Sequence, residues 1–178
     1  MFDCEKNVTI GITFGCFIPL HSGHLDMIQK SRAVHQKTIV AVCGYDGDRG
    51  DGFIPFRERI VLMKQVFAFC PDVIVVAVDD HKIGLTGTFS KTAWSIWCDE
   101  LFQQTGLLPD DPSISFEWYM GERDYLTKIR NLYPRHWYHL LDRSKHPISG
   151  SMIRQQWTDY VGDIHPVFLQ YLRKVALL

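Results

Sequence analysis

Five apolar runs rich in β-branched residues alternate along the chain with helix-like segments. Each run is nearly continuous in apolar residues, which is typical of strands buried on both faces. The predicted strands cover residues 8–14, 38–44, 73–78, 114–120 and 137–141. The predicted helices cover residues 23–35, 56–69, 90–104, 123–132, a stretch from 151 onward, and 166–175. This alternation predicts an α/β fold: a Rossmann-like, doubly wound, parallel five-stranded sheet with helices on both faces.

In such a sheet, ligands bind beyond the carboxyl ends of the strands, where the winding reverses. The segments that follow the five predicted strands should therefore face one crevice. Glycines, acids, arginines and hydroxyls concentrate in these segments, while the strands and helix faces stay apolar. The segments are residues 15–24, 45–52, 79–89, 121–125 and 142–151.

The composition is that of an ordinary globular protein, with 46% hydrophobic and 22% charged residues. We expect a single domain over residues 1–178, without low-complexity or repeated segments. The formal net charge of −1 supplies no field that would hold a nucleic acid. Basic residues must therefore act locally, and nucleic acid is not an expected partner.

The cysteines and the N-terminal residues bear on the compartment. Five cysteines are spread along the chain without a Cys-x-x-Cys pair, which favours free thiols and a cytoplasmic location. No run of about eighteen apolar residues is present, and Asp3 and Glu5 stand where a signal peptide would be basic and then apolar. We expect neither export nor a membrane, while a homo-oligomer is left open.

The first predicted strand runs into a turn punctuated by glycine and proline, with the sequence Gly-Cys-Phe-Ile-Pro-Leu-His-Ser-Gly-His at residues 15–24. Such a turn before a helix offers backbone N–H groups to an anion, with Gly15 allowing a close approach and Pro19 ending the strand. His21 and His24, three residues apart, would face the same anion from one helical turn. The segment predicts a phosphate site.

Three other interpretations compete here. The histidines could be ordinary core or solvated residues, although the strand and glycine turn before them argue against it. They could bind zinc with Cys16, but the usual Cys-x-x-Cys or His-Glu-x-x-His companions are absent. A dinucleotide fingerprint for hydride transfer would need Gly-x-Gly-x-x-Gly, which this turn lacks.

A second segment, Pro-Ile-Ser-Gly-Ser-Met-Ile-Arg at residues 147–154, opens a predicted helix with hydroxyls and places a cation one turn later. Helix capping alone would explain a serine at this position. Ser149, Ser151 and Arg154 would also suit an anion, and the histidine segment in the same chain favours that interpretation.

These two segments resemble the signatures of the nucleotidyltransferase superfamily, G-x-F-x-P-x-H-x-G-H and, in its adenylyltransferase branch, I-S-x-[ST]-x-I-R. The resemblance implies that His21, His24 and Arg154 are catalytic. It implies that Ser149 and Ser151 hold the β- and γ-phosphates of ATP. It also places Gly15, Phe17, Glu122 and Arg123 in the ATP site.

Most of the chain, from residue 8 to about residue 172, resembles the nicotinamide mononucleotide adenylyltransferase domain of NadR-like proteins. The shared features are Gly-Tyr-Asp-Gly-Asp-Arg-Gly at 44–50, Trp-Ser-Ile-Trp at 94–97, Glu-Arg-Asp-Tyr at 122–125 and Asp-Arg at 142–143. Gly121 replaces an expected serine. Such proteins often carry a kinase domain or a helix-turn-helix; neither is expected here, since G-x-x-x-x-G-K-[ST] is absent and seven residues precede the first strand.

Four residues are candidates for the second substrate. An indole face is a good partner for a flat cation such as pyridinium, so we expect Trp94 or Trp97 to stack on nicotinamide, unless the pair merely packs into the core. Asp46 and Arg49 would suit a nucleotide 5′-phosphate and ribose hydroxyls, unless they form an ordinary charged turn.

The resemblance implies transfer of AMP from ATP to nicotinamide mononucleotide, giving NAD and pyrophosphate. The attacking phosphate is already anionic, so the protein must supply position and countercharge rather than a strong base. Mg²⁺ is expected to accompany ATP, and no residue is assigned as a metal ligand. The alternatives are transfer to another acceptor, such as nicotinic acid mononucleotide, pantetheine phosphate or a cytidylyl acceptor, and a non-catalytic nucleotide sensor.

Overall fold

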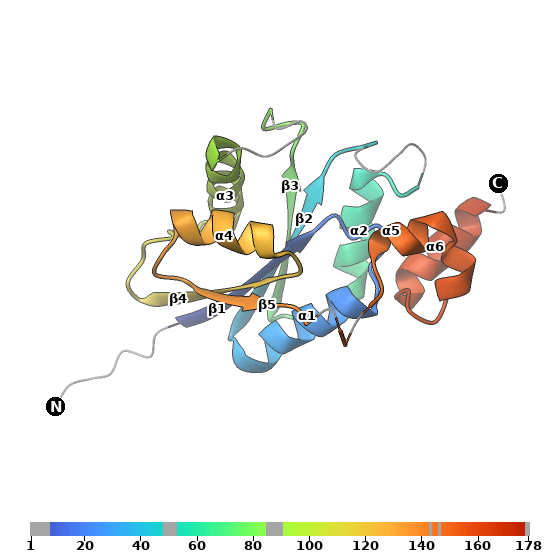
Figure 1. Cartoon of the computed structure of the whole chain (residues 1–178), viewed down its shortest axis with the longest axis horizontal. Helices are drawn as coiled ribbons and strands as arrows, with labels where there is room; N and C mark the ends of the chain where they lie inside the picture. Colours follow the sequence, from blue (N-terminus) through green and yellow to red (C-terminus); the bar gives the residue numbers. More distant parts are fainter. Residues whose placement is uncertain (1–7, 48–52, 85–90, 143, 146, 177–178) are drawn as a thin grey trace.

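The computed structural model describes residues 8–47, 53–84, 91–142, 144–145 and 147–176. Within these ranges, five strands form one sheet in the order β3-β2-β1-β4-β5, and every neighbouring pair is parallel (Figure 1). The strands are β1 (Val8–Gly15), β2 (Lys37–Gly44), β3 (Val73–Asp79), β4 (Ile114–Met120) and β5 (Trp137–Leu140). The predicted α/β class and parallel five-stranded sheet are confirmed.

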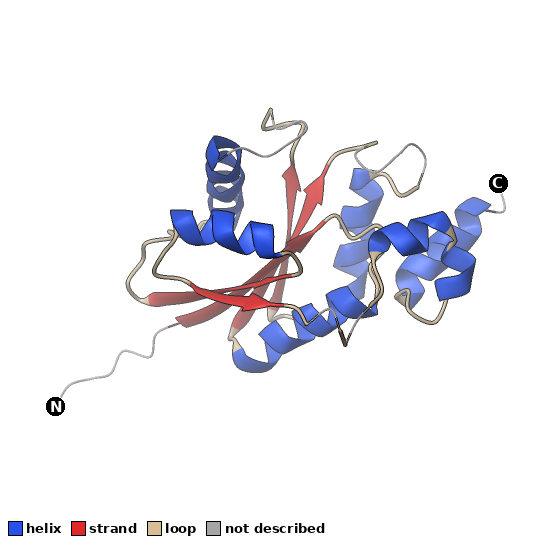
Figure 2. Cartoon of the chain, in the orientation of Figure 1, coloured by secondary structure: helices blue, strands red, loops and turns tan. Residues whose placement is uncertain are grey.

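Helices connect consecutive strands and follow the last one (Figure 2). They are α1 (Ser22–Val34), α2 (Phe56–Val66), α3 (Lys91–Thr105), α4 (Arg123–Leu132), α5 (Gly150–Gln155), the 3-10 helix η1 (Trp157–Tyr160) and α6 (Pro166–Ala176). α3 and α4 cover one face of the sheet, and α1, α2 and α6 lie on the other, so the sheet is doubly wound as predicted (Figure 1).

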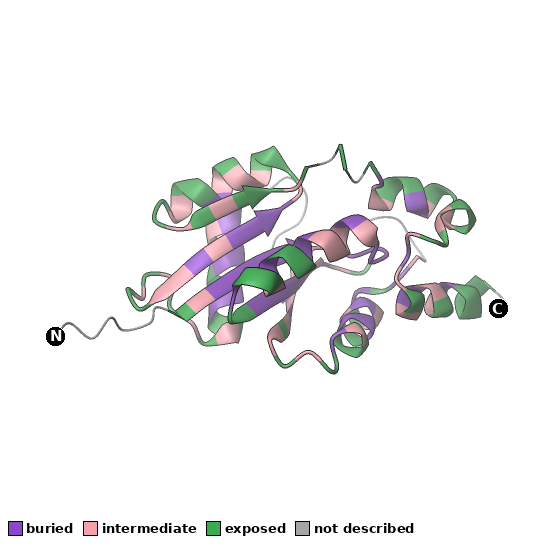
Figure 3. Ribbon diagram, turned by 90° about the horizontal axis from the view of Figure 1, so that it is seen from below, coloured by how far each residue is buried: buried purple, intermediate pink, exposed green. Residues whose placement is uncertain are grey.

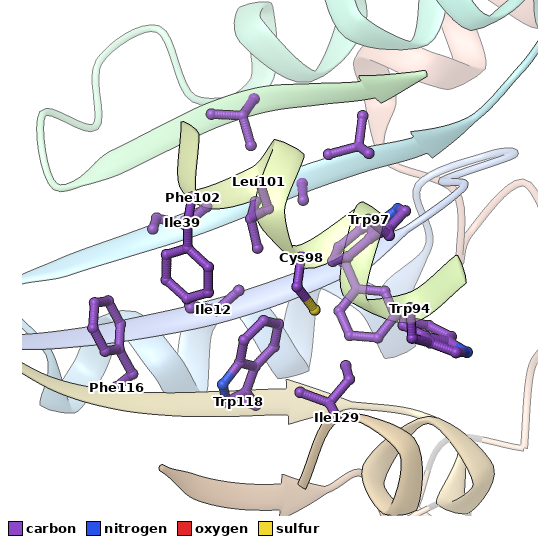
Figure 4. Close-up of a cluster of buried hydrophobic side chains, with 14 of the residues drawn as sticks. Ile12, Ile39, Trp94, Trp97, Cys98, Leu101, Phe102, Phe116, Trp118 and Ile129 are labelled. Atoms are coloured by element: carbon purple, nitrogen blue, oxygen red, sulfur yellow. The ribbon is translucent and has the colours of Figure 1, made fainter. Parts of the chain in front are cut away.

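Two apolar clusters hold these layers together, one on each face of the sheet. On α3, the side chains of Trp94, Trp97, Cys98 and Leu101 recur at helical spacing and pack on β1 and β2 (Figure 4). On the other face, Val40 and Val42 of β2 pack with α1, α2 and α6. Figure 3 accordingly shows the central strands as largely buried and the outer sides of the helices as exposed.

The two edge strands are less buried than their apolar sequences predict. Trp137 in β5 is 66% exposed, and alternate residues of β3 are only partly buried. An edge strand lacks a neighbour on one side, and its outer part is not fully covered by helices. At the edge of β3, the side chain of Gln104 forms two hydrogen bonds with the backbone of Ala77. Its Nε2 donates to the Ala77 carbonyl at 2.6 Å, and its Oε1 accepts from the Ala77 N–H at 3.3 Å. This side-chain amide satisfies backbone groups that would otherwise invite another strand.

Gly11 in β1 determines how closely α1 packs on the sheet. A β-carbon at this position would lie 1.8 Å from Ser31 Oγ and 2.7 Å from the ring of His35. We expect Gly11→Ala to lower the free energy of unfolding by about 1–3 kcal/mol, because α1 must move away from the sheet. Urea unfolding measures this change. The control Gly162→Ala adds a methyl group that meets nothing within 4 Å, and should cost less than about 0.5 kcal/mol. Equal losses in both variants would contradict the packing argument.

His136 is a partly buried histidine that should make stability fall in acid. Its Nδ1 accepts from Trp118 Nε1 at 3.0 Å, so its Nε2 carries the proton and donates to the carbonyl of Pro109 at 2.9 Å. Burial lowers the pKa of His136, although the Pro109 carbonyl and the Asp110 carboxylate partly oppose this.

The unfolded chain takes up a proton near the ordinary histidine pKa of about 6.5, whereas native His136 resists it. The free energy of unfolding should therefore decrease as the pH falls through about 6.5 toward the lower native pKa. Urea unfolding at about pH 7.5 and about pH 5.5 measures the decrease, which should be smaller in His136→Gln. An identical pH dependence in the variant would show that His136 does not contribute.

Candidate nucleotide site

The strand order places the topological switch point of the sheet beside β1. β2 and β3 extend from β1 on one side, β4 and β5 on the other, so the winding reverses where β1 and β4 are neighbours. Ligands of doubly wound sheets bind at this point, beyond the carboxyl ends of the strands. The segments that begin there are residues 16–21 after β1 and residues 121–122 after β4.

The loop after β1 is largely buried and has an unusual backbone. Phe17 has a φ of 49°, in the left-handed region, and its ring is only 1% exposed. The Ile18–Pro19 peptide bond that follows is cis. A β-carbon on Gly15 would make ordinary contact with the Phe17 ring at 3.4 Å. The space around Gly15 therefore does not by itself require glycine, and the close approach of Gly15 and Phe17 to ATP stays a prediction.

The structure brings His21 and His24 together at the start of α1. Their rings stack with centroids 3.8 Å apart and an interplanar angle of 27°. His21 is 4% exposed and His24 is half-buried, with the Phe17 ring edge-on to it at 5.0 Å. Two imidazoles fixed in this way can act on one anion.

A segment that the sequence did not single out, residues 163–165, anchors this loop. The Ser22 N–H donates to the Asp163 carbonyl at 2.9 Å, and Ser22 Oγ donates to the Asp163 carboxylate at 3.0 Å. The His165 N–H donates to the Leu20 carbonyl at 3.0 Å. The first amide of α1 is thus hydrogen-bonded within the protein, and the prediction that this helix N-terminus offers backbone donors to an anion rests on the amides that follow it.

Arg154 on α5 joins the second sequence segment to the first. Its Nη1 donates to the carbonyl of Ile18, 136 positions away in the sequence, at 3.1 Å, and its Nη2 donates to Ser151 Oγ at 3.1 Å. Gly150 leaves room for this approach, because a β-carbon there would lie 3.1 Å from Arg154 Nη1 and 3.2 Å from the Ile18 oxygen, which is tighter than most real contacts. Sequence reasoning missed this role of Gly150, for which the only signal was a glycine between two serines.

Ser149 is the N-cap of α5, where its Oγ accepts from the Met152 N–H at 3.3 Å. The capping interpretation of this serine is therefore observed, and its contact with a phosphate stays a prediction. Just before it, hydrogen bonds from the Ser144 hydroxyl and N–H lower the pKa of Asp142. The Arg143 beside it lies outside the described residues.

Asp46 and Arg49, the residues predicted to bind the second substrate, follow β2, and only Asp46 lies within the described residues. Asp46 accepts a hydrogen bond from the backbone N–H of Phe56, the first residue of α2, through Oδ1. Arg49 lies outside the described residues, so its contact with a 5′-phosphate stays a prediction.

At the end of β2, a hydrogen bond with the Cys16 thiol, together with burial, raises the pKa of Cys43.

Glu122 and Arg123 are exposed at the start of α4, where the chain leaves β4 next to β1. This is the edge of the sheet that carries the histidine loop. Their predicted contacts with ATP are compatible with this position and stay predictions.

Trp94 and Trp97 lie in the core between α3 and the sheet (Figure 4). They are 4% and 1% exposed, and their rings lie 5.9 Å and 5.1 Å from that of Phe14. Tyr125 adds a further ring 5.2 Å from Trp94. Neither indole presents an open face, so the packing interpretation is the one observed. Stacking of Trp94 or Trp97 on a pyridine stays a prediction.

The described part of the chain contains no group of three or more His, Cys, Asp or Glu side chains placed to hold a metal ion. Cys16, His21 and His24 are accordingly not gathered into such a group. Among the helices that the structure describes, none has both the length and the apolar character needed to span a bilayer.

A parallel sheet with a paired-histidine loop at its switch point, contacted by an arginine from a later helix, defines a nucleotide-binding α/β protein. Residues 12–156 match the cytidylyltransferase-like family, and the chain belongs to this family.

Solved structures resemble the chain over most of its length. A NadR protein in complex with NR is 26% identical, with a TM-score of 0.73 over 92% of this chain and 46% of that one. NadR in complex with NAD and AMP-PNP is also 26% identical, with a TM-score of 0.71 over 91% of this chain and 47% of that one. A bifunctional NMN adenylyltransferase/ADP ribose pyrophosphatase from Francisella tularensis, 17% identical with a TM-score of 0.65 over 86% of this chain and 43% of that one, shares the fold.

Curated relatives include phosphopantetheine adenylyltransferases. The one from Alkalilimnicola ehrlichii is 35% identical over 65 residues, which cover 36% of this chain and 37% of the relative. The one from Leuconostoc citreum is 33% identical over 82 residues, which cover 46% of this chain and 48% of the relative. The matched segments thus span less than half the length of these relatives.

Proposed function

We propose that this protein is an adenylyltransferase that transfers AMP from ATP to the phosphate of nicotinamide mononucleotide, giving NAD and pyrophosphate. The observation that carries the proposal is the meeting of Arg154 with the loop that bears the stacked His21 and His24, at the switch point of the sheet. Family membership supports nucleotidyl transfer. The NadR structures bound to NR and to NAD with AMP-PNP support a pyridine nucleotide as acceptor.

In the proposed reaction, an oxygen of the acceptor phosphate attacks the α-phosphorus of ATP in line. The bond from the α-phosphorus to the bridging oxygen breaks, and its electron pair leaves with pyrophosphate. No proton has to be removed from the anionic nucleophile, so positioning and countercharge are the main needs. His21 and His24 bind the triphosphate near the α-phosphorus, and Arg154 balances the charge that develops on pyrophosphate.

Mg²⁺ enters this proposal as part of the substrate, bound to the phosphate oxygens of ATP. The described residues offer no cage of acidic side chains for it. The roles assigned to the chain therefore concern only binding, orientation and charge.

The direct test is to incubate the protein with Mg-ATP and, separately, nicotinamide mononucleotide, nicotinic acid mononucleotide and 4′-phosphopantetheine, measuring pyrophosphate and identifying the product by mass. We expect the fastest release of pyrophosphate with nicotinamide mononucleotide, together with NAD. The short matches to phosphopantetheine adenylyltransferases make 4′-phosphopantetheine the second candidate. Faster turnover with either other acceptor would reassign the substrate. Binding of ATP without pyrophosphate from any acceptor would indicate a sensor.

A further inference from the structure

Arg59 is a buried cation with no role in the reaction proposed above. It lies on α2, is 1% exposed, and donates hydrogen bonds to backbone carbonyls. Its Nη1 donates to the carbonyls of Cys16 at 2.9 Å and Cys43 at 3.1 Å, and its Nη2 donates to the carbonyl of Tyr45 at 3.0 Å. Burying a guanidinium is costly, and these charge-assisted bonds offset that cost.

Two of the three carbonyls, those of Cys16 and Tyr45, belong to different loops, and the third, that of Cys43, belongs to the end of β2. Gly15 is paired with Val42 in the register of β1 and β2, so Cys16 and Cys43 come next, where the two strands part. Cys16 begins the histidine loop, and Tyr45 begins the segment that carries the acceptor candidate Asp46. One guanidinium therefore bridges the starts of both loops.

The first turn of α2 holds the second loop at another point as well. The guanidinium of Arg59 lies over the ring of Phe56 at 5.1 Å, and the Phe56 N–H binds the carboxylate of Asp46. Tyr45 and Asp46 are thus both fixed to α2, through a carbonyl and a side chain. The same turn reaches the histidine loop through Cys16, so its position sets the spacing between the two loops.

We propose that Arg59 is a positioning residue that sets the distance between the loop holding the triphosphate and the loop holding the acceptor phosphate. This inference rests on the proposed function. In-line attack requires the two phosphates to be held in a near-attack geometry, and a misplacement of about 1 Å can cost about a hundredfold in rate. Each substrate still binds to its own loop when Arg59 is changed, so the loss falls on kcat.

Lysine cannot replace Arg59 fully. The planar guanidinium presents several N–H groups in fixed directions, which lets it reach carbonyls on both loops, whereas an ammonium group is a single point on a flexible stem. The order of activity should therefore be arginine, then lysine, then glutamine.

The test compares Arg59→Lys and Arg59→Gln with Leu62→Ala. Leu62 lies on the same helix and is 6% exposed, and its apolar side chain forms no hydrogen bond to a loop carbonyl. We expect kcat per folded molecule to fall about a hundredfold in Arg59→Gln and less in Arg59→Lys, while calorimetric affinities for Mg-ATP and for the acceptor alone change less than about threefold. Leu62→Ala should lower the unfolding temperature but keep kcat. A kcat within about twofold of wild type in both folded Arg59 variants would overturn the proposal.

Hydrogen exchange separates this proposal from the proposed function. Amides of residues 16–21 and 43–46 should exchange faster in Arg59→Gln than in Leu62→Ala, because only the first change releases the loops. If the wild-type protein releases no pyrophosphate with any acceptor, the proposed function fails, and the exchange experiment alone decides whether Arg59 holds the loops. Unchanged exchange in these segments would overturn the positioning role.

Discussion

His24→Ala should lower kcat for pyrophosphate release by about 10²–10³-fold while the protein stays folded. His24 is half-buried in the first turn of α1, stacked on His21 at 3.8 Å and edge-on to Phe17 at 5.0 Å. Under the proposed function, this ring lies against the triphosphate, where charge changes during the transfer. Steady-state rates with Mg-ATP and nicotinamide mononucleotide measure the loss, and circular dichroism with the unfolding temperature checks the fold.

His139→Ala is a suitable control, because it removes another histidine that lies on the edge strand β5 and outside the histidine loop. His139 lies on β5, its side chain is 47% exposed, and it bonds Glu117 at 2.6 Å. Its kcat should stay within about twofold of wild type. His24→Asn retains a polar side chain of smaller size, so it tests the role even if the alanine variant unfolds. A folded His24 variant with near-normal turnover would contradict the assigned role.

The apolar pattern predicted the sheet well because each run is long enough to cross a buried layer. The pattern was wrong about the end of a helix where an apolar side chain is buried in a turn and not in a helix or strand. α2 was expected to continue to residue 69 but ends at Val66. Phe67 is still 8% exposed, and so prolongs the apolar pattern, whereas Phe69 is 98% exposed in the turn that follows. Burial of one more side chain does not require one more helical turn.

The sequence also predicted that the two site segments lie at the same edge of the sheet, because a parallel sheet sends all its strand ends there, and the contact of Arg154 with Ile18 agrees with this. It did not reveal what holds the segments together. Arg154 and Arg59 bind the carbonyls of Ile18, Cys16, Cys43 and Tyr45, and any residue type can supply a backbone carbonyl. Such acceptors leave no trace in the sequence, and only the folded chain shows them.

The tryptophan pair shows the opposite limitation. Trp94 and Trp97 are conspicuous in the sequence, but their spacing of three residues suits both a ligand contact and an apolar helix face. The contacts of both rings with Phe14 show that this face packs on the sheet. The spacing therefore predicted that both tryptophans lie on one side of the helix. Only the packing in the folded chain shows what that side contacts.

Arg154→Ala should lower kcat by about 10²–10³-fold and raise the KM for ATP less. The guanidinium is held by the Ile18 carbonyl and Ser151 Oγ, both at 3.1 Å, so it is oriented before substrate arrives. A group that balances charge on departing pyrophosphate stabilises the transition state more than bound ATP, and its loss therefore falls mainly on kcat. Initial rates over a range of Mg-ATP concentrations separate the two constants.

Two graded variants test whether orientation, and not charge alone, matters at this position. Arg154→Lys keeps the charge but cannot reproduce the two directed bonds, so its kcat should lie between those of wild type and Arg154→Ala. Gly150→Ala keeps the arginine but places a β-carbon 3.1 Å from Nη1 and 3.2 Å from the Ile18 oxygen. It should lower kcat less than Arg154→Ala does, because the guanidinium or the histidine loop has to shift by a few tenths of an ångström. A rise in KM for ATP at unchanged kcat in Arg154→Ala would instead assign the residue to ground-state binding, since uniform loss of affinity leaves the chemical step untouched.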